Sequence, residues 1–239
     1  MADKQKLFDG KEESPWIKPI VAVPERCPRS LAPLLTLDEL WLQQEKRWHE
    51  EWKKFVPRSK FWLKNADNEN IYWIEEEHSE TGNMAWGSDR EFKIIAKDEA
   101  GTGVISFFRP FKAKAAWLNW LNLESTGWHL EVTSLEEGGS EPSPLGIVKQ
   151  VGSNFHKKFD IMDAEGVVKA RIRGPLFESQ VWTEDIDFDL LDPEDKKKKI
   201  GKIVRKYAGF KNEVLAKAQH FQMKIPALHY HEILYCTRS

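Results

Sequence analysis

The apolar positions along the chain predict a mostly β protein, because most apolar runs are short and separated by turn residues. The runs "KFWLKN" and "NIYWIEEE" flank "ADNE", and "EFKIIAKDEAGTGVISFFRPF" places "DEAGTG" between two further strands. Residues 158–177 repeat the second arrangement, with Asp-x-x-Gly between two strands. A looser similarity links residues 145–155 with residues 200–210. Repeated hairpins of this kind indicate one β architecture built from similar units.

One segment follows a helical pattern instead. In "TLDELWLQQEKRWHEEWKKF", residues 36–55, Thr36 and Glu39 form a capping-box pattern, and apolar residues recur at helical spacing with Glu and Lys between them. We therefore predict an amphipathic helix over 36–55, ended by Pro57. Residues 1–33 contain five prolines and little periodicity. They predict a flexible N-terminal arm, followed by a single domain over 34–239.

Composition describes an ordinary globular domain. The 239 residues are 41% hydrophobic and 31% charged, with a net charge of −2, so any attraction to anionic surfaces must come from a local patch. The two cysteines, Cys27 and Cys236, form no disulfide framework or metal-ligand spacing, which favours an intracellular setting. The first residues are polar, and no apolar run reaches the roughly 18 residues of a membrane-spanning helix.

Tryptophan is unusually frequent, with eleven residues, nine of them between positions 40 and 130. Indole rings suit packed cores and also the boundary between membrane and water. Core packing and partial burial are the expected role, and interfacial contact is the alternative.

The clearest charged feature is a basic segment without any acidic residue, "KKKKIGKIVRKYAGFK". Its eight basic residues are Lys196, Lys197, Lys198, Lys199, Lys202, Arg205, Lys206 and Lys211. Such a segment can attract anionic lipid headgroups, a nuclear-import receptor or a nucleic acid, or it can be a solvated strand. Just before it, Asp185, Asp187 and Asp189 share one face of a predicted strand. They could bind a hard cation, but a solvated face balanced by the nearby lysines is the favoured interpretation.

No enzyme signature occurs: Gly-x-Ser-x-Gly, P-loop and dinucleotide fingerprints are all missing from the sequence. His229 and His231 lie near His220 and Glu232, but this spacing is not characteristic of a metal site. We therefore predict no chemical catalysis and no bound metal at these residues.

Six segments, in order, resemble blocks of the phospholipid scramblases. They are "CPRSLAPLLTLDELWLQQ", "EFKIIAKDEAGTGVISFFRPFK", "LGIVKQ", "FDIMDAEGVVKARIRGP", "DIDFDLLD" and "IGKIVRKYAGFKNEV", and the resemblance covers roughly residues 27–226. It implies a tubby-like fold, a closed antiparallel barrel of about twelve strands around a central apolar helix. It also implies ATP-independent, calcium-triggered movement of phospholipids between leaflets, at the plasma membrane and sometimes in the nucleus. "GKIVRKYAGF" matches the place of a basic nuclear-import signal in that family.

The sequence departs from the family where its members carry a cysteine cluster used for palmitoylation. That place reads "FKAKAAWLNWLNLES", without cysteine. Trp117 and Trp120 could instead contact a membrane interface, or pack inside the barrel.

A second departure concerns calcium. The family's acidic calcium-binding segment corresponds to "EVLAKAQHFQMKIP" and the residues after it, where Phe221 and Pro226 are kept but Lys217, Gln219 and Leu228 replace aspartates. Because calcium needs several oxygen ligands, we expect its ligands to be absent here. The family continues with an apolar C-terminal helix, whereas the chain continues with "ALHYHEILYCTRS", which is too polar for that role.

The expected function is that of a scramblase with doubtful calcium control, acting on membrane phospholipids from a peripheral, intracellular position on the cell membrane. The alternative is a soluble, non-transporting lipid- or protein-binding module, whose basic segment could recruit a nuclear-import receptor and give it a nuclear location. A DNA-binding role is disfavoured by the slightly negative net charge.

Overall fold

The computed structural model describes residues 15–17, 29–35, 37–45, 60–77, 91–110, 128–135, 142–151, 157–175, 184–207 and 220–225. They contain a short 3-10 helix, η1, and twelve strands. Their bounds are η1 Arg29–Leu34, β1 Glu39–Gln44, β2 Lys60–Lys64, β3 Asn70–Glu77, β4 Phe92–Lys97, β5 Gly103–Arg109, β6 His129–Ser134, β7 Ser143–Gln150, β8 Lys158–Asp163, β9 Val168–Arg173, β10 Ile186–Leu191, β11 Lys199–Lys206 and β12 His220–Lys224.

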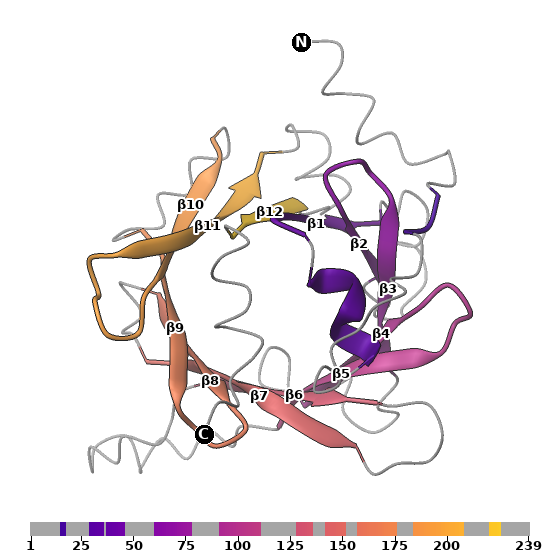
Figure 1. The fold of residues 1–239 in the computed structure, drawn as a ribbon, viewed down its shortest axis with the longest axis horizontal. Helices are drawn as coiled ribbons and strands as arrows, with labels where there is room; N and C mark the ends of the chain where they lie inside the picture. The colour runs from indigo at the N-terminus through magenta and orange to yellow at the C-terminus, as the bar shows by residue number, and fades with distance from the viewer. Residues whose placement is uncertain are drawn as a thin grey trace, which may run out of the picture.

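The strands form a closed antiparallel barrel (Figure 1). Each strand pairs with its neighbours in sequence, and β1 pairs with β12 to complete the ring. Closure leaves no strand with a free edge, which is the usual solution for a sheet of this size. The predicted mostly β, closed antiparallel barrel is confirmed.

Three tight hairpins, β2–β3, β4–β5 and β8–β9, use the same local device. In each hairpin, an Asn or Asp lies at the end of the first strand or just after it. Its side-chain oxygen accepts a hydrogen bond from the backbone N–H four residues later. These bonds run from Glu69 to Asn65 (2.8 Å), from Thr102 to Asp98 (2.8 Å) and from Val167 to Asp163 (2.7 Å). Asx side chains favour turns for this reason, so the Asp-x-x-Gly similarity in the sequence corresponds to a repeated hairpin.

Each of these three turns contains one residue with a left-handed backbone conformation. Asn68 has a φ of 64°, and Gly101 and Gly166 each have a φ of 81°. A left-handed residue at this place forms a bulge, and the register shifts beside each of the three turns. Asparagine and glycine adopt this conformation at the lowest cost.

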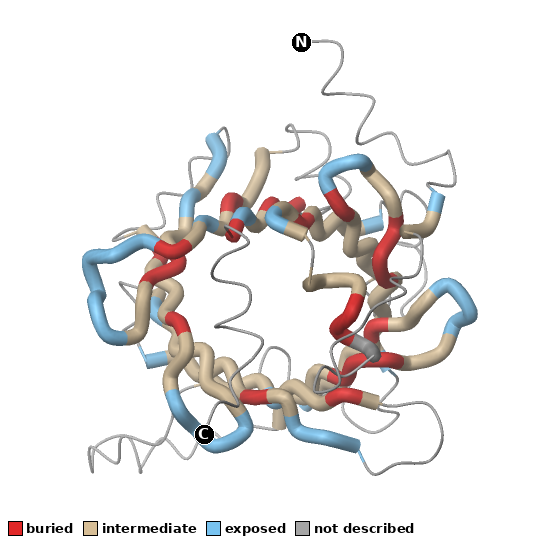
Figure 2. The backbone as a smooth tube through the Cα atoms, viewed as in Figure 1, coloured by how far each residue is buried: buried red, intermediate tan, exposed pale blue. Residues whose placement is uncertain are grey.

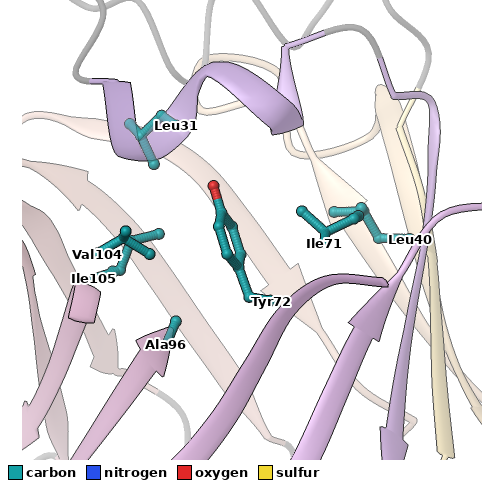
Figure 3. Packing of buried hydrophobic residues seen from close by; sticks show 7 residues of the cluster. All are labelled: Leu31, Leu40, Ile71, Tyr72, Ala96, Val104 and Ile105. Atoms are coloured by element: carbon teal, nitrogen blue, oxygen red, sulfur yellow. The ribbon is translucent and has the colours of Figure 1, made fainter. Parts of the chain in front are cut away.

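Alternation along the strands separates an inner apolar face from an outer polar one. One core cluster joins β1, β3, β4 and β5 with η1 (Figure 3), and it consists of Leu31, Leu40, Ile71, Tyr72, Ala96, Val104 and Ile105. A second cluster on the opposite side consists of Ala170, Leu190, Ile200 and Ile225. Exposed residues gather at the hairpin turns, whereas the strands are mostly buried or half-buried (Figure 2).

Part of the predicted flexible arm belongs to the barrel. In Figure 1, η1 lies inside the ring of strands, beside β3–β5. Leu31 and Ala32 are each only 6% exposed. Further upstream, the backbone of Asn70 bonds to Pro15 (2.7 Å) and Ile17 (2.9 Å). The arm prediction is therefore wrong for these residues, and the rest of 1–33 lies outside the described residues.

The predicted helix over 36–55 is wrong in its described part, because Glu39–Gln44 form strand β1. This segment pairs with β12 on one side and β2 on the other. Backbone hydrogen bonds to two neighbouring strands outweigh the modest helix propensity of Leu, Gln and Glu. Residues 46–55 lie outside the described residues.

Within the described residues, no helix has the length and apolar character needed to cross a membrane. The C-terminal stretch after Ile225, where the sequence departs from the family's apolar helix, lies outside them.

Candidate functional site

The basic segment lies mainly on strand β11. Lys199, Lys202, Arg205 and Lys206 belong to this strand, and Lys196, Lys197 and Lys198 lie in the turn that precedes it. Strand β11 is hydrogen-bonded to β10 on one side and to β12 on the other. The segment is therefore an integral barrel strand with a basic turn attached. Lys211 lies outside the described residues.

Acidic side chains of β10 and of the residues just before and after it meet the lysines of β11 and its turn. The ion pairs are Asp185–Lys206 (2.9 Å), Asp187–Lys202 (2.8 Å), Asp189–Lys199 (2.8 Å) and Asp192–Lys198 (3.0 Å), and Asp189 also meets Arg173 of β9 (3.2 Å). We refer to this set as the β10–β11 ion-pair ladder. The favoured interpretation of an acidic face balanced by lysines fits this arrangement.

The ladder leaves the predicted basic patch with little excess charge. Four of its seven described members, Lys198, Lys199, Lys202 and Lys206, lie opposite carboxylates. Lys196 and Lys197 are exposed in the turn, next to Glu194 and Asp195. Nor does the acidic strand offer a cation site, because among the described residues no group of three or more His, Cys, Asp or Glu could hold a metal ion.

Two carboxylates of the ladder have a lowered pKa. Burial alone would raise the pKa of Asp189, but hydrogen bonds from Lys199 and Arg173 outweigh it, and the net direction is down. Hydrogen bonds from the Lys198 side chain and from two backbone N–H groups lower the pKa of Asp192 to about 2. Both groups therefore stabilise the fold in their charged form.

We expect Asp192→Asn to reduce the acid sensitivity of folding. The pKa of Asp192 is lower in the folded state, so its contribution is complete above an unfolded pKa of about 4 and is lost as the pH falls towards 2. The variant should be less stable than the wild type near neutral pH, and the gap should close between about pH 4 and about pH 2. Urea midpoints across that range measure it.

Lys198→Gln is the matched partner for this experiment, because it removes the first cause of the pKa shift. Lys198→Gln should also make the free energy of unfolding vary less between about pH 4 and about pH 2. If the difference in stability between wild type and Asp192→Asn is as large at about pH 2 as at neutral pH, the prediction is contradicted.

The segment compared with the family's calcium motif contains strand β12. Phe221 pairs with Leu42 of β1 and Arg205 of β11, on the same face as Met223, which packs against the core. No carboxylate occurs in His220–Lys224, so these residues do not fit a calcium ion. Lys217, Gln219, Pro226 and Leu228 lie outside the described residues.

On the outer face, β12 is fastened to β1 by the carboxylate of Glu39. This carboxylate accepts hydrogen bonds from Gln222 (2.5 Å) and from Trp41 (2.8 Å), and it forms an ion pair with Lys224 (3.0 Å). Burial would raise the pKa of Glu39, but these partners lower it overall. The described part of the segment therefore closes the barrel.

The described strand tryptophans lie on the outer face of the barrel and are half-buried, so the expected partial burial is found but core packing is not. Trp62 pairs with Gln43 and Trp73, and Trp73 pairs with Lys97. Their neighbours in sequence, Leu63 and Tyr72, belong to the inner core. Neither core cluster of the described residues includes a tryptophan. Trp117 and Trp120 lie outside the described residues.

Arg109 was not predicted as a notable residue. Its guanidinium stacks between the rings of Phe92 (4.1 Å to the ring centre) and Trp128 (4.6 Å). Arg109 pairs with Phe92 on the inner face, two residues after the core-packed Phe107. In the sequence, the only sign of this arrangement is the "FRPF" motif at the end of β5, where Arg109 stands between aromatic residues.

Sequence comparison now assigns the barrel to a family. The family description "Scramblase" matches residues 18–231 of the chain. The chain belongs to the scramblase family. The match spans every described strand, from β1 to β12.

Individual scramblases are similar at low identity. The chain is 24% identical to mouse "Phospholipid scramblase 1" over 91% of its own length and 62% of the relative's. It is 26% identical to bovine "Phospholipid scramblase 2" over 89% of its length and 68% of the relative's, and 27% identical to human "Phospholipid scramblase family member 5" over 71% and 58%. The chain thus spans about three fifths of the length of the mouse relative. No solved structure gives a significant match.

Proposed function

We propose that this protein moves phospholipids between the two leaflets of a bilayer, in both directions and without ATP. The observation that carries the proposal is the scramblase match across residues 18–231, which spans the whole described barrel. The names of the similar proteins, phospholipid scramblases 1 and 2, support the same activity. In this role the protein is a lipid transporter rather than a chemical catalyst, and it works from a peripheral position on the cytoplasmic side of the cell membrane.

We further propose that calcium does not control this activity through the segment around Phe221. Side chains of β12 alternate between the core, where Met223 packs, and the outer contacts of Gln222 and Lys224 with Glu39. Calcium favours sites with several carboxylate or carbonyl oxygens and net negative charge. The Lys224 ammonium and the Gln222 amide N–H already bind Glu39, and the single amide oxygen of Gln222 does not supply the several oxygen ligands that calcium needs.

Reconstitution into liposomes that contain a fluorescent phospholipid tests both parts of the proposal. We expect the protein to accelerate the exchange of the labelled lipid between leaflets, with the same rate in calcium and in a calcium chelator. Empty liposomes and liposomes with heat-denatured protein are the controls.

Each outcome of this experiment has a separate meaning. No acceleration in either condition would contradict the transport function and favour the alternative, a soluble module that binds lipid or protein without transport. Acceleration only in calcium would support transport and contradict the proposal that calcium control is lost.

The basic segment has a smaller role in this proposal than its sequence suggests. Its carboxylate partners on β10 and just before it reduce the attraction that unpaired lysines would exert on anionic lipid. A nuclear-import receptor that binds an extended peptide would have to separate β11 from β10 and β12. Recruitment of such a receptor, and a nuclear location, stay predictions.

A further inference from the structure

The outer face of β2–β4 carries tryptophans whose rings contact one another. Trp62 and Trp73 are cross-strand partners with ring centres 6.3 Å apart. Trp16, from the segment that bonds to Asn70, adds a third ring at 6.0 Å from Trp62, in an edge-on arrangement. All three residues are half-buried, so each remains partly accessible to solvent.

Two lysines accompany these rings. The ammonium of Lys60 lies 5.4 Å from the ring centre of Trp73, and that of Lys97 lies 5.2 Å from it. Both distances fall within the range of cation–π attraction. We call Trp16, Trp62, Trp73, Lys60 and Lys97 the tryptophan–lysine face.

This part of the barrel has an excess of positive charge. The outward positions of β2–β4 hold four lysines and two glutamates, namely Lys60, Lys64, Lys93, Lys97, Glu75 and Glu77. The two glutamates pair with Lys97 and Lys93. The surface therefore complements a negatively charged partner, in contrast to the β10–β11 ion-pair ladder across the barrel, where acids and lysines balance (Figure 1).

The residue types indicate which partner fits. Indole combines a large apolar ring with a polar N–H, and it concentrates where lipid headgroups meet the hydrocarbon layer. Lysine extends its charge towards anionic headgroups while its aliphatic stem stays on apolar surface. Protein–protein interfaces also favour tryptophan, but their centres are depleted of lysine. Lysines placed over the ring of Trp73 thus favour a lipid surface.

We propose that the tryptophan–lysine face is the surface with which the barrel docks on an anionic phospholipid bilayer. The proposal builds on the proposed lipid transport, since it names the surface through which the barrel reaches its substrate. It assigns the docking role to described residues on β2–β4 and the preceding segment, rather than to the basic segment of β11.

Vesicle flotation with the full chain tests the proposal, with vesicles of phosphatidylcholine alone or mixed with phosphatidylserine. We expect wild-type protein to bind the mixed vesicles more tightly, and added salt to weaken this binding. Lys60→Glu should lower the partition into mixed vesicles about five-fold or more, because each basic residue near an anionic surface contributes about that factor. Lys197→Glu is the matched control, and it should change the partition by less than about two-fold.

The tryptophan contribution is tested by Trp62→Ala combined with Trp73→Ala. This double variant should lose about ten-fold or more in binding to both kinds of vesicle, because part of each ring leaves water on docking. Circular dichroism and thermal melting check that the barrel is intact. If the double variant does not fold, the comparison of Lys60→Glu with Lys197→Glu still decides the question.

Wild-type binding from folded Lys60→Glu, or equal losses in Lys60→Glu and Lys197→Glu, would overturn the proposal. A third outcome would also overturn it. If the wild type is a dimer, and the double tryptophan variant is a monomer that still binds vesicles, the face joins two copies of the chain instead of docking on lipid. Docking and transport can fail separately. Vesicle binding through this face without lipid exchange would contradict only the transport function, and lipid exchange with unaltered binding by the variants would contradict only the docking surface.

Discussion

Replacing Gly146 with alanine is expected to destabilise the fold severely. A Cβ at this position would lie 2.2 Å from the carbonyl oxygen of Met162, a distance that real Cβ atoms do not reach. Gly146 pairs with Asp163 in the β7–β8 ladder, so the obstacle is backbone that cannot rotate away. Overpacking against a rigid neighbour costs about 3 kcal/mol or more, a large part of the roughly 5–15 kcal/mol that stabilises a domain. Urea denaturation and soluble yield measure the effect.

Gly101→Ala provides the matched control. Gly101 has a φ of +81°, but nothing lies within 4 Å of the added Cβ, so only backbone strain opposes the substitution. We expect a loss of about 1 kcal/mol. If Gly146→Ala is no more destabilising than Gly101→Ala, the close approach of β7 to β8 is not as tight as the structure has it.

Leu31→Asp is expected to have the second large effect. Leu31 is 6% exposed and lies on η1 inside the ring, facing the cluster around Tyr72 and Val104 (Figure 3). Truncation to alanine should cost about 2–5 kcal/mol because it leaves a cavity among these side chains. Aspartate should cost more, since it also places a carboxylate in an apolar environment. Thermal and urea unfolding of both variants measure the effects.

Val151→Asp is the control for the introduced charge, because Val151 is 50% exposed and needs no burial. We expect a change within about 0.5 kcal/mol. If Leu31→Asp is equally mild, then η1 does not contribute to the core, and the prediction of a flexible arm would be restored for these residues.

The hairpins could be predicted from the sequence because their determinants are local. An Asx residue, a left-handed glycine or asparagine and two apolar strands lie within 16 to 18 residues in each hairpin. Asp98 with Gly101, and Asp163 with Gly166, show this in its complete form. Closure of the barrel was an implication of the family resemblance, because no local pattern indicates which strand lies beside β1.

Strand β1 shows the limit of periodicity. Leu37, Leu40 and Trp41 fit a helical stripe, yet Leu40 faces the core whereas Trp41 lies on the outer face and binds Glu39. Whether this segment forms a strand or a helix depends on pairing with β12, whose Gln222 is 183 residues from Glu39. A window of 20 residues cannot contain that partner.

The tryptophans could not be placed by composition for a related reason. In "FWLK" and "YWIE" every central residue is apolar, so the alternation of faces is hidden. Register reveals it: Leu63 and Tyr72 pair on the inner face, while Trp62 and Trp73 pair on the outer one. The balance of acids and lysines on β10 and β11 was easier to predict. Both charge patterns are present in the sequence, and only the pairing between individual residues had to come from the structure.

The seam between β1 and β12 affects how the protein is made in a cell. The paired residues are about 183 positions apart, and ribosomes add roughly 5–20 residues per second, so β12 emerges about 10 to 40 seconds after β1. During that time β1 has a hydrogen-bonding edge without its final partner, and such edges can pair with other chains. The barrel therefore closes late in translation, and slower synthesis of its last third would prolong the exposure of β1 to misassembly.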